Sequence, residues 1–168
     1  MMLSFRNIDI GNEAEVRLAA DFRRDIYAGN DQHGRFESRY KDDAGYADYL
    51  NQVIARNPNY VFWLCDGDEI VGHGVARGVS DIWRFEDGNV DIVAVLPQYR
   101  GRGFGKAILA HCAELLHQDG FKVVWLDCLK GHAANMGFYA AQGWQQVADH
   151  PDHPHHAIWE NKMQGSVG

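Results

Sequence analysis

Hydrophobic and polar residues alternate along the chain with two periods, one typical of helices and one typical of strands. Apolar residues that recur every three or four positions predict helices over residues 13–27, from 42 or 43 to 57, from the glycine-rich stretch 101–105 to 117, and over 133–142. Runs rich in β-branched and aromatic residues predict strands over residues 3–8, 60–65, 70–79, 89–96, 121–128, 144–148 and 158–162. Residues 31–41 and 81–88 are polar and predict loops. This order favours one mixed sheet with helices on both sides.

The length and composition are typical of one soluble globular domain over residues 1–168, with 46% apolar and 23% charged residues. The first residues lack a basic start and an apolar signal core, and no window approaches the ~18–20 apolar residues that span a bilayer. We therefore expect a cytoplasmic protein without a membrane partner. The three cysteines form no C-x-x-C pair, so we expect reduced thiols rather than a disulfide framework or a zinc site.

The net charge and its distribution along the chain indicate which class of ligand the protein binds. The formal net charge of −7 disfavours a general nucleic-acid binder. Against this acidic background, Arg100, Arg102 and Lys106 form a local basic cluster between glycines. A strand, a glycine-rich turn and a helix N-terminus form an anion site, because unpaired N–H groups and the helix dipole act in the same direction. The cluster therefore indicates a small phosphorylated ligand.

Two known phosphate-binding patterns fit the glycines incompletely. The loop of nucleotide hydrolases needs G-x-x-x-x-G-K followed by Ser or Thr, whereas this chain is one residue short and has Ala107. The dinucleotide pattern G-x-G-x-x-G fits Gly101 and Gly103, but its third glycine falls on Lys106. Asp127 could take the part of the ribose-binding acid, so a dinucleotide-binding protein stays open as an alternative. Only about 65 residues follow the loop, too few for the usual paired halves.

A third pattern, R/Q-x-x-G-x-G/A, fits residues 100–105. Here the chain resembles the GNAT superfamily of N-acetyltransferases. The segment VDIVAVLPQYRGRGFGKAIL is similar to the family's fourth strand and third helix, FKVVWLDC to its fifth strand, and NMGFYAAQGW to its fourth helix and next strand. The resemblance covers residues 90–147.

The resemblance implies a fold and an activity. The fold would be α/β (α+β), with a mixed, mostly antiparallel sheet of six to seven strands, helices on both faces, and strands four and five parallel and splayed. The activity would be that of an acyltransferase, which moves an acetyl group from acetyl-CoA to a primary amine of a small molecule or peptide by direct attack in a ternary complex. Relatives commonly dimerise, but no stretch of this sequence predicts an interface, so a homodimer stays open.

The resemblance also assigns roles to residues. It implies that the pyrophosphate of acetyl-CoA binds to a loop formed by Arg100, Gly101, Arg102, Gly103, Phe104, Gly105 and Lys106. The backbone of Val93, Ala94 and Val95 would pair with the pantetheine arm and the thioester oxygen. Phe138 would pack on that arm, Tyr139 would give a proton to the thiolate, and Asp91 would deprotonate the amine. Tyr139 could instead be a core aromatic, and Asp91 could pair with an arginine.

The chain departs from the family pattern at His132, where the family often has Asn. His132 could bond the pantetheine or act as a base, or Asn135 could replace it. The segment HPDHPHH, residues 150–156, lacks the spacing of a metal site, and we expect a solvated loop near the acceptor and no metal. Cys128 allows an acetyl-cysteine route as an alternative to direct transfer. A regulatory CoA-binding module without turnover is the alternative function.

The resemblance implies that residues in two segments wall the acceptor pocket, although they could equally be surface packing. They are Asp81, Trp83, Arg84, Phe85 and Glu86 before the fourth strand, and Tyr27, His33, Phe36 and Tyr40 between the first two helices. An acidic and aromatic lining would suit a cationic amine.

Overall fold

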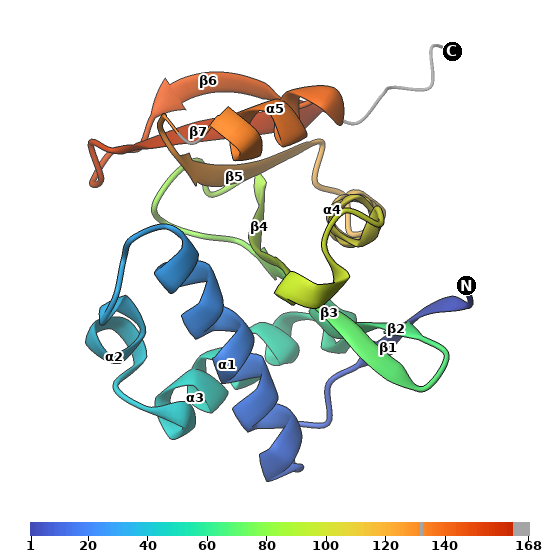
Figure 1. The fold of residues 1–168 in the computed structure, drawn as a ribbon. Helices are drawn as coiled ribbons and strands as arrows, with labels where there is room; N and C mark the ends of the chain where they lie inside the picture. Colours follow the sequence, from blue (N-terminus) through green and yellow to red (C-terminus); the bar gives the residue numbers. More distant parts are fainter. Residues whose placement is uncertain (132, 163–168) are drawn as a thin grey trace. The chain divides into compact units, whose positions relative to one another are not determined.

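The secondary structure follows the predicted order with one addition. The computed structural model describes residues 1–131 and 133–162. Its elements are β1 (Leu3–Asn7), α1 (Glu13–Gly29), α2 (Arg35–Tyr40), α3 (Asp43–Arg56), β2 (Val61–Asp66), β3 (Glu69–Gly78), β4 (Gly88–Val95), α4 (Phe104–Gln118), β5 (Val123–Leu129), α5 (Ala133–Ala141), β6 (Gln145–Asp149) and β7 (His156–Lys162), with 3-10 turns at Pro58–Tyr60 and Pro97–Tyr99 (Figure 1).

The strands form a seven-stranded mixed sheet in the order β1-β2-β3-β4-β5-β7-β6. The pair β4–β5 is parallel, and the pairs β1–β2, β2–β3, β5–β7 and β6–β7 are antiparallel. The predicted fold class is therefore confirmed. Among the described residues, no helix is long and apolar enough to cross a membrane.

The chain divides into two compact units. The first comprises Met1–Val75 and Ile92–Ala110, and the second comprises Ala76–Asp91 and the residues from His111 onwards. That residues 1–168 form a single domain stays a prediction.

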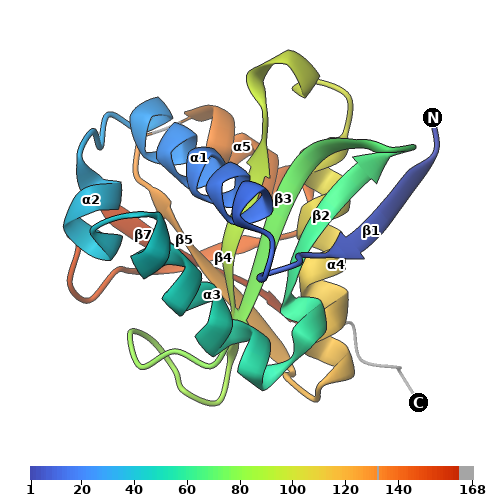
Figure 2. The same ribbon diagram turned by 90° about the horizontal axis from the view of Figure 1, so that it is seen from below.

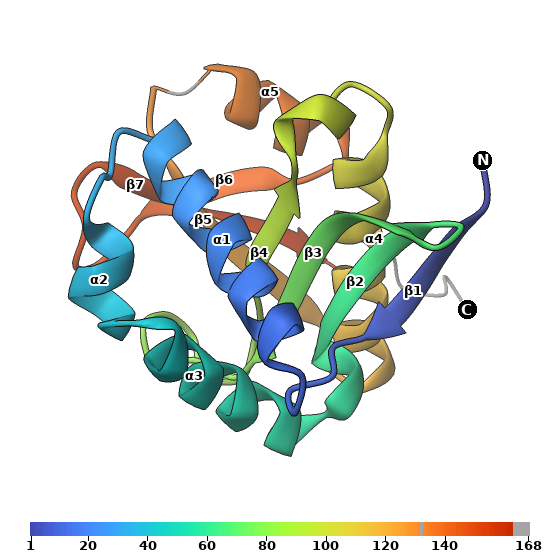
Figure 3. The ribbon, with the colours of Figure 1, turned by 60° about the horizontal axis from the view of Figure 1, so that its bottom comes forward.

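In the first unit, α1 and the first half of α4 cover opposite faces of the β2–β3 pair (Figures 2 and 3). Trp63 and His73 are cross-strand partners, and the ring of Phe22 in α1 lies 5.8 Å and 5.9 Å from theirs. On the other face a Cβ on Gly74 would meet the side chain of Ile108 in α4. Glycine here lets α4 approach the sheet closely.

The short helix α2 corrects the prediction of a loop over residues 31–41. Its buried side chains are Phe36 and Tyr40, which lie one helical turn apart with ring centroids separated by 5.3 Å. Both also pack on Tyr46 of α3, at 5.5 Å and 4.8 Å. A six-residue helix offers one pair of apolar positions, too few to show a period among polar neighbours.

In the second unit, α5 packs on one face of the strands β5, β7 and β6. Tyr139 of α5 lies 6.1 Å from Trp159 of β7, measured between ring centroids. Side chains alternate along a strand, so His156, three residues before Trp159, lies on the opposite face. Its cross-strand partner is Leu129 of β5, which shares that opposite face with Asp127. The two faces of β5 are therefore chemically different.

Gly45, in the first turn of α3, is expected to resist substitution by alanine. Its N–H group donates to the capping carboxylate of Asp42 at 2.9 Å, and an added Cβ would collide with the backbone carbonyl of Tyr40. Alanine normally favours a helix by about 1 kcal/mol over glycine. We nevertheless expect Gly45→Ala to lower the free energy of unfolding in urea by about 1–3 kcal/mol, because backbone must move.

The matched control is Gly137→Ala in α5, where an added Cβ would meet nothing within 4 Å. This variant should be as stable as the wild type or more stable. A Gly45→Ala protein with unchanged stability would contradict the packing described for the corner between α2 and α3.

Candidate functional site

The turn between β4 and α4 is shaped by two glycines. Gly101 has φ of +79° and Gly103 has φ of +84°, values that residues with a Cβ rarely adopt. A Cβ added to either glycine would meet nothing within 4 Å. The backbone conformation, rather than crowding, therefore requires glycine, and the space beside both residues is open.

The helix α4 begins at this turn. The N–H group of Ala107 donates to the carbonyl of Gly103 at 3.2 Å, so the N–H groups that come before it in the helix have no carbonyl within the helix to bond. Phe104 is 1% exposed, and its side chain belongs to the core of the first unit. Because the ring of Phe104 is buried, it cannot contact a ligand, and only the backbone of this residue can make the predicted contact. The turn can hold an anion through main-chain donors.

The three basic side chains of the turn differ in their contacts. Arg100 donates through Nε to the carbonyl of Val95 at 3.1 Å and through Nη2 to Asp25 of α1 at 2.8 Å. Arg102 is exposed, with its guanidinium 5.8 Å from the ring centroid of Tyr99, and Lys106 is exposed on the first turn of α4. Arg100 therefore braces the turn, and the other two cations face solvent. A contact of Arg100 with ligand stays a prediction.

The strand β4 carries the residues predicted to hold the pantetheine arm. Ala94 is buried, whereas Val93 and Val95 are partly exposed. The parallel pairing with β5 joins Gly88 to Val124 and Asn89 to Trp125, at the first residues of both strands. The Asn89 side chain reinforces this pairing, since its Nδ2 donates to the carbonyl of Trp125 at 3.3 Å.

Tyr139 lies in an aromatic group with Phe138, Trp144 and Trp159, at centroid distances of 5.3, 6.5 and 6.1 Å. Desolvation, followed by the charges of Cys128 and Asp127, raises the pKa of its phenol above the usual range. The phenol is therefore protonated at neutral pH and has a proton to donate. Its role in catalysis stays a prediction.

Cys128 is a poor nucleophile. The side chain is buried, and burial together with the charge of Asp127 raises the pKa of its thiol to about 11. A thiol must ionise to attack a thioester, so very little thiolate is present at neutral pH. This argues against the acetyl-cysteine route.

An acid–imidazole pair that sequence reasoning missed lies at the ends of β5 and β7. His156 Nδ1 and Asp127 Oδ2 are 2.7 Å apart. Desolvation acts to raise the pKa of Asp127, but the hydrogen bond and charge of His156 outweigh it, and the pKa lies below the usual range. Asp127 is therefore a carboxylate at neutral pH and accepts the Nδ1–H hydrogen bond.

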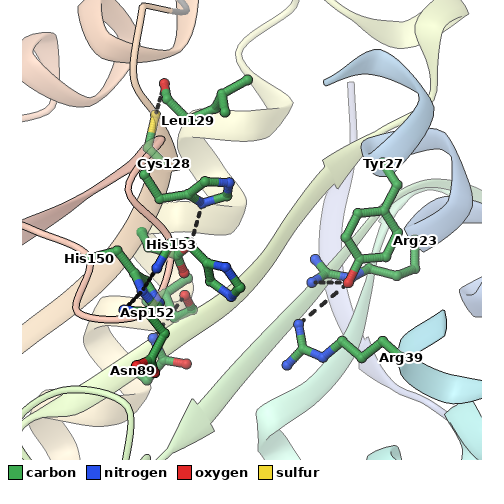
Figure 4. Close-up of polar contacts among 12 residues, drawn as sticks. Arg23, Tyr27, Arg39, Asn89, Cys128, Leu129, His150, Asp152 and His153 are labelled. Atoms are coloured by element: carbon green, nitrogen blue, oxygen red, sulfur yellow. Dashed lines mark hydrogen bonds and ion pairs between the residues drawn. The ribbon is translucent and has the colours of Figure 1, made fainter. Parts of the chain in front are cut away.

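The histidine-rich loop is held by His150, whose Nδ1 accepts the N–H groups of Asp152 and His153, both at 3.0 Å (Figure 4). His150 is buried, and desolvation lowers its pKa below the usual range, so the ring is neutral. The expectation of a solvated loop is thus wrong for His150, although Pro154 and His155 are exposed. In the described part of the chain, no group of three or more His, Cys, Asp or Glu residues could hold a metal ion.

The residues predicted to wall an acceptor pocket are only partly available. Phe36 and Tyr40 are buried in the core of the first unit, where their rings stabilise the corner between α2 and α3. Tyr27 is also buried, and its hydroxyl accepts hydrogen bonds from Arg23 at 3.0 Å and Arg39 at 3.4 Å (Figure 4). Phe36 and Tyr40 are therefore residues of the core rather than of a pocket wall.

The remaining predicted site residues are Asp91, Asn135 and His132. Asp91 is partly exposed on β4, two residues beyond Asn89, and the register with β5 places its side chain on the same face as that of Asp127. Asn135 is partly exposed in the first turn of α5. His132 lies outside the described residues.

Comparison with known proteins places this geometry in a family. A [ribosomal protein bS18]-alanine N-acetyltransferase of Haemophilus influenzae is 27% identical over 84 residues, which cover 50% of this chain and 53% of that protein. The chain therefore matches about half the length of this curated relative.

Solved structures share the fold. The PaiA N-acetyltransferase of Thermoplasma acidophilum in complex with coenzyme A has a TM-score of 0.74 and 16% identity, covering 97% of this chain and 100% of that one. The ribosomal-protein-S18-alanine N-acetyltransferase of Escherichia coli has a TM-score of 0.60 and 15% identity, covering 99% of both chains. The model of the acetyltransferase (GNAT) family matches residues 21–144, and because this match covers well over half of the sequence, the chain belongs to the GNAT family of acetyltransferases.

Proposed function

We propose that the protein transfers an acetyl group from acetyl-CoA to a primary amine by direct attack in a ternary complex. The observation that carries this proposal is the turn between β4 and α4, where Gly101 and Gly103 have positive φ and open space beside them. Exposed N–H groups at such a turn fit a diphosphate, and Arg102 and Lys106 add the positive charge that phosphates favour. Acetyl-CoA supplies the activated acetyl thioester.

The acceptor that we favour is an amine on a protein or peptide. The curated relative is named for acetylation of an alanine of a ribosomal protein, and this proposal extends its class of acceptor to the present chain. Two carboxylates, Asp91 and Asp127, share one face of the second unit and would attract an ammonium group. A small-molecule amine is the alternative acceptor.

Three groups have proposed parts in the transfer. The backbone N–H groups at Val93–Val95 would polarise the thioester carbonyl, as oxyanion donors do. Tyr139 would protonate the departing thiolate, for which its raised pKa keeps a proton available at neutral pH. The part of Asp91 as the base stays a prediction.

A CoA-binding module without turnover is the alternative function, and release of free thiol distinguishes the two. An acetyltransferase releases coenzyme A when acetyl-CoA and an amine are both present, and a binding module does not. A panel of N-terminal peptides and small amines, followed with a thiol reagent, provides this test.

Arg102→Glu is expected to weaken binding of coenzyme A. The substitution removes one charge-assisted hydrogen bond and adds repulsion, which corresponds to a loss in affinity of about 10- to 100-fold. Isothermal calorimetry measures the loss, and Arg17→Glu, the same charge change at an exposed position of α1, should leave the affinity unchanged. Equal affinity of both variants, or tighter binding of NAD than of coenzyme A, would exclude the proposed turn.

Tyr139→Phe is expected to lower kcat by about 10²- to 10⁴-fold, since it removes the proton donor for the thiolate. The ring and its aromatic contacts are retained, so the affinity for coenzyme A and the melting temperature should stay close to those of the wild type. Thiol release under saturating substrate measures kcat. A variant with full kcat would show that Tyr139 is a packing residue only.

A further inference from the structure

On the basis of the acetyl transfer proposed above, we infer that His156, oriented by Asp127, takes the proton of the acceptor amine. This assigns the base to a residue of β7 rather than to Asp91 of β4.

The sheet brings the two residues together from positions 29 apart in the sequence. Leu129 of β5 is the cross-strand partner of His156, and Asp127 lies two residues before Leu129 on the same face. The imidazole and carboxylate meet diagonally across the strands, with Nδ1 and Oδ2 2.7 Å apart. Both side chains remain accessible, at 19% exposure for His156 and 35% for Asp127. Both members of the pair are therefore in contact with solvent.

Two backbone hydrogen bonds fix the position of the His156 backbone, from which the imidazole extends. The N–H group of His156 donates to the carbonyl of His153 at 2.9 Å, and its carbonyl accepts the N–H group of His150 at 3.0 Å. The loop that supplies these partners is closed by the buried ring of His150. A reacting group held on a fixed backbone loses little entropy when it acts.

The carboxylate sets the tautomer of the imidazole. Since Asp127 is ionised, it accepts the Nδ1–H bond, and the lone pair of the neutral ring is then on Nε2. Asp127 itself is a weak base, because its pKa lies below the usual range. This is the division of work in acid–imidazole pairs, where the carboxylate orients the ring and the ring moves the proton.

The charged and titratable groups around the pair come from three elements. Asp127 lies on β5 and Asp91 on β4, and the loop before β7 contributes His150, Asp152 and His153. The ring centroids of His150 and His153 lie 6.2 Å and 5.7 Å from that of His156. His150 is neutral, so the two carboxylates make this face attractive to an ammonium ion.

The proton balance uses both faces of β5. R–NH₃⁺ gives one proton to Nε2 of His156, which passes it to water, and the nitrogen lone pair attacks the thioester carbonyl carbon. The C–N bond forms and the C–S bond breaks, while Tyr139 gives a proton to the thiolate. The attacking nitrogen then loses its second proton to water, and one proton from water restores the Tyr139 phenol. The net products are the amide, the free thiol and one proton.

The first test replaces His156 by Asn, which keeps an N–H donor near Nδ1 but has no basic nitrogen. We expect kcat/KM to fall by about 10²- to 10⁴-fold, the usual contribution of a general base. Any fall in the wild-type rate at low pH should be absent from the pH profile of His156→Asn, and added imidazole should restore part of the rate in His156→Ala. Affinity for coenzyme A should not change.

The matched control is His155→Asn. His155 is exposed in the same loop, and its backbone carbonyl accepts the N–H group of Lys130 at 2.7 Å. This variant should keep the wild-type rate and pH profile.

A second test measures the positioning role of Asp127 without turnover. Long-range ¹H–¹⁵N spectra of the histidine side chains report which ring nitrogen carries the proton, and the His156→Asn spectrum assigns the signal. Wild-type His156 should carry its proton on Nδ1, and Asp127→Asn should change this tautomer and lower kcat more than it raises KM.

Each outcome bears on a stated proposal. If wild-type protein releases thiol with an amine while His156→Asn retains its rate and pH profile, the inference is wrong and the proposed function stands. If Asp91→Asn alone removes the low-pH fall, Asp91 is the base and the inference is wrong. If the wild type binds coenzyme A and releases no thiol with any amine, both the acetyl transfer and the inference are contradicted.

Discussion

The turn between β4 and α4 takes its shape from the left-handed conformations of Gly101 and Gly103, and the space beside both residues is open. A Cβ at either position would strain this conformation, and a different turn would direct the N–H groups elsewhere. The buried ring of Phe104 and the contacts of Arg100 with Asp25 and Val95 hold the turn in place. Every chemical step proposed for the protein requires that this turn binds a diphosphate.

The strand β5 separates two kinds of proton chemistry in the second unit. Its Cys128 face is packed against α5, where desolvation keeps Tyr139 protonated at neutral pH. Its other face carries the ionised Asp127 with His156. Alternation of side chains along one strand thus places a proton donor and a proton acceptor on opposite sides of the same backbone. In the proposed reaction the amine loses a proton and the departing thiolate gains one, so the two roles fall to different residues.

Much of the fold could be predicted because its signals are local. Glycine spacing, strand runs and helix periods indicated the order of elements and the phosphate-binding turn. The short helix with Phe36 and Tyr40 was missed because two apolar residues make no period, and the burial of His150 depends on contacts that spacing does not encode. The pair of Asp127 and His156 arises from the β5–β7 register, and no local pattern in the sequence marks residues 29 positions apart.

Backbone amide chemical shifts of ¹⁵N-labelled protein, followed during titration with coenzyme A, test the central claim most directly. The account predicts that the largest shifts occur at Gly101, Gly103 and residues 104–106, because their N–H groups would bond the diphosphate. Pantetheine, which lacks the diphosphate, should leave these signals in place. Binding of coenzyme A with those amides unmoved would contradict the account.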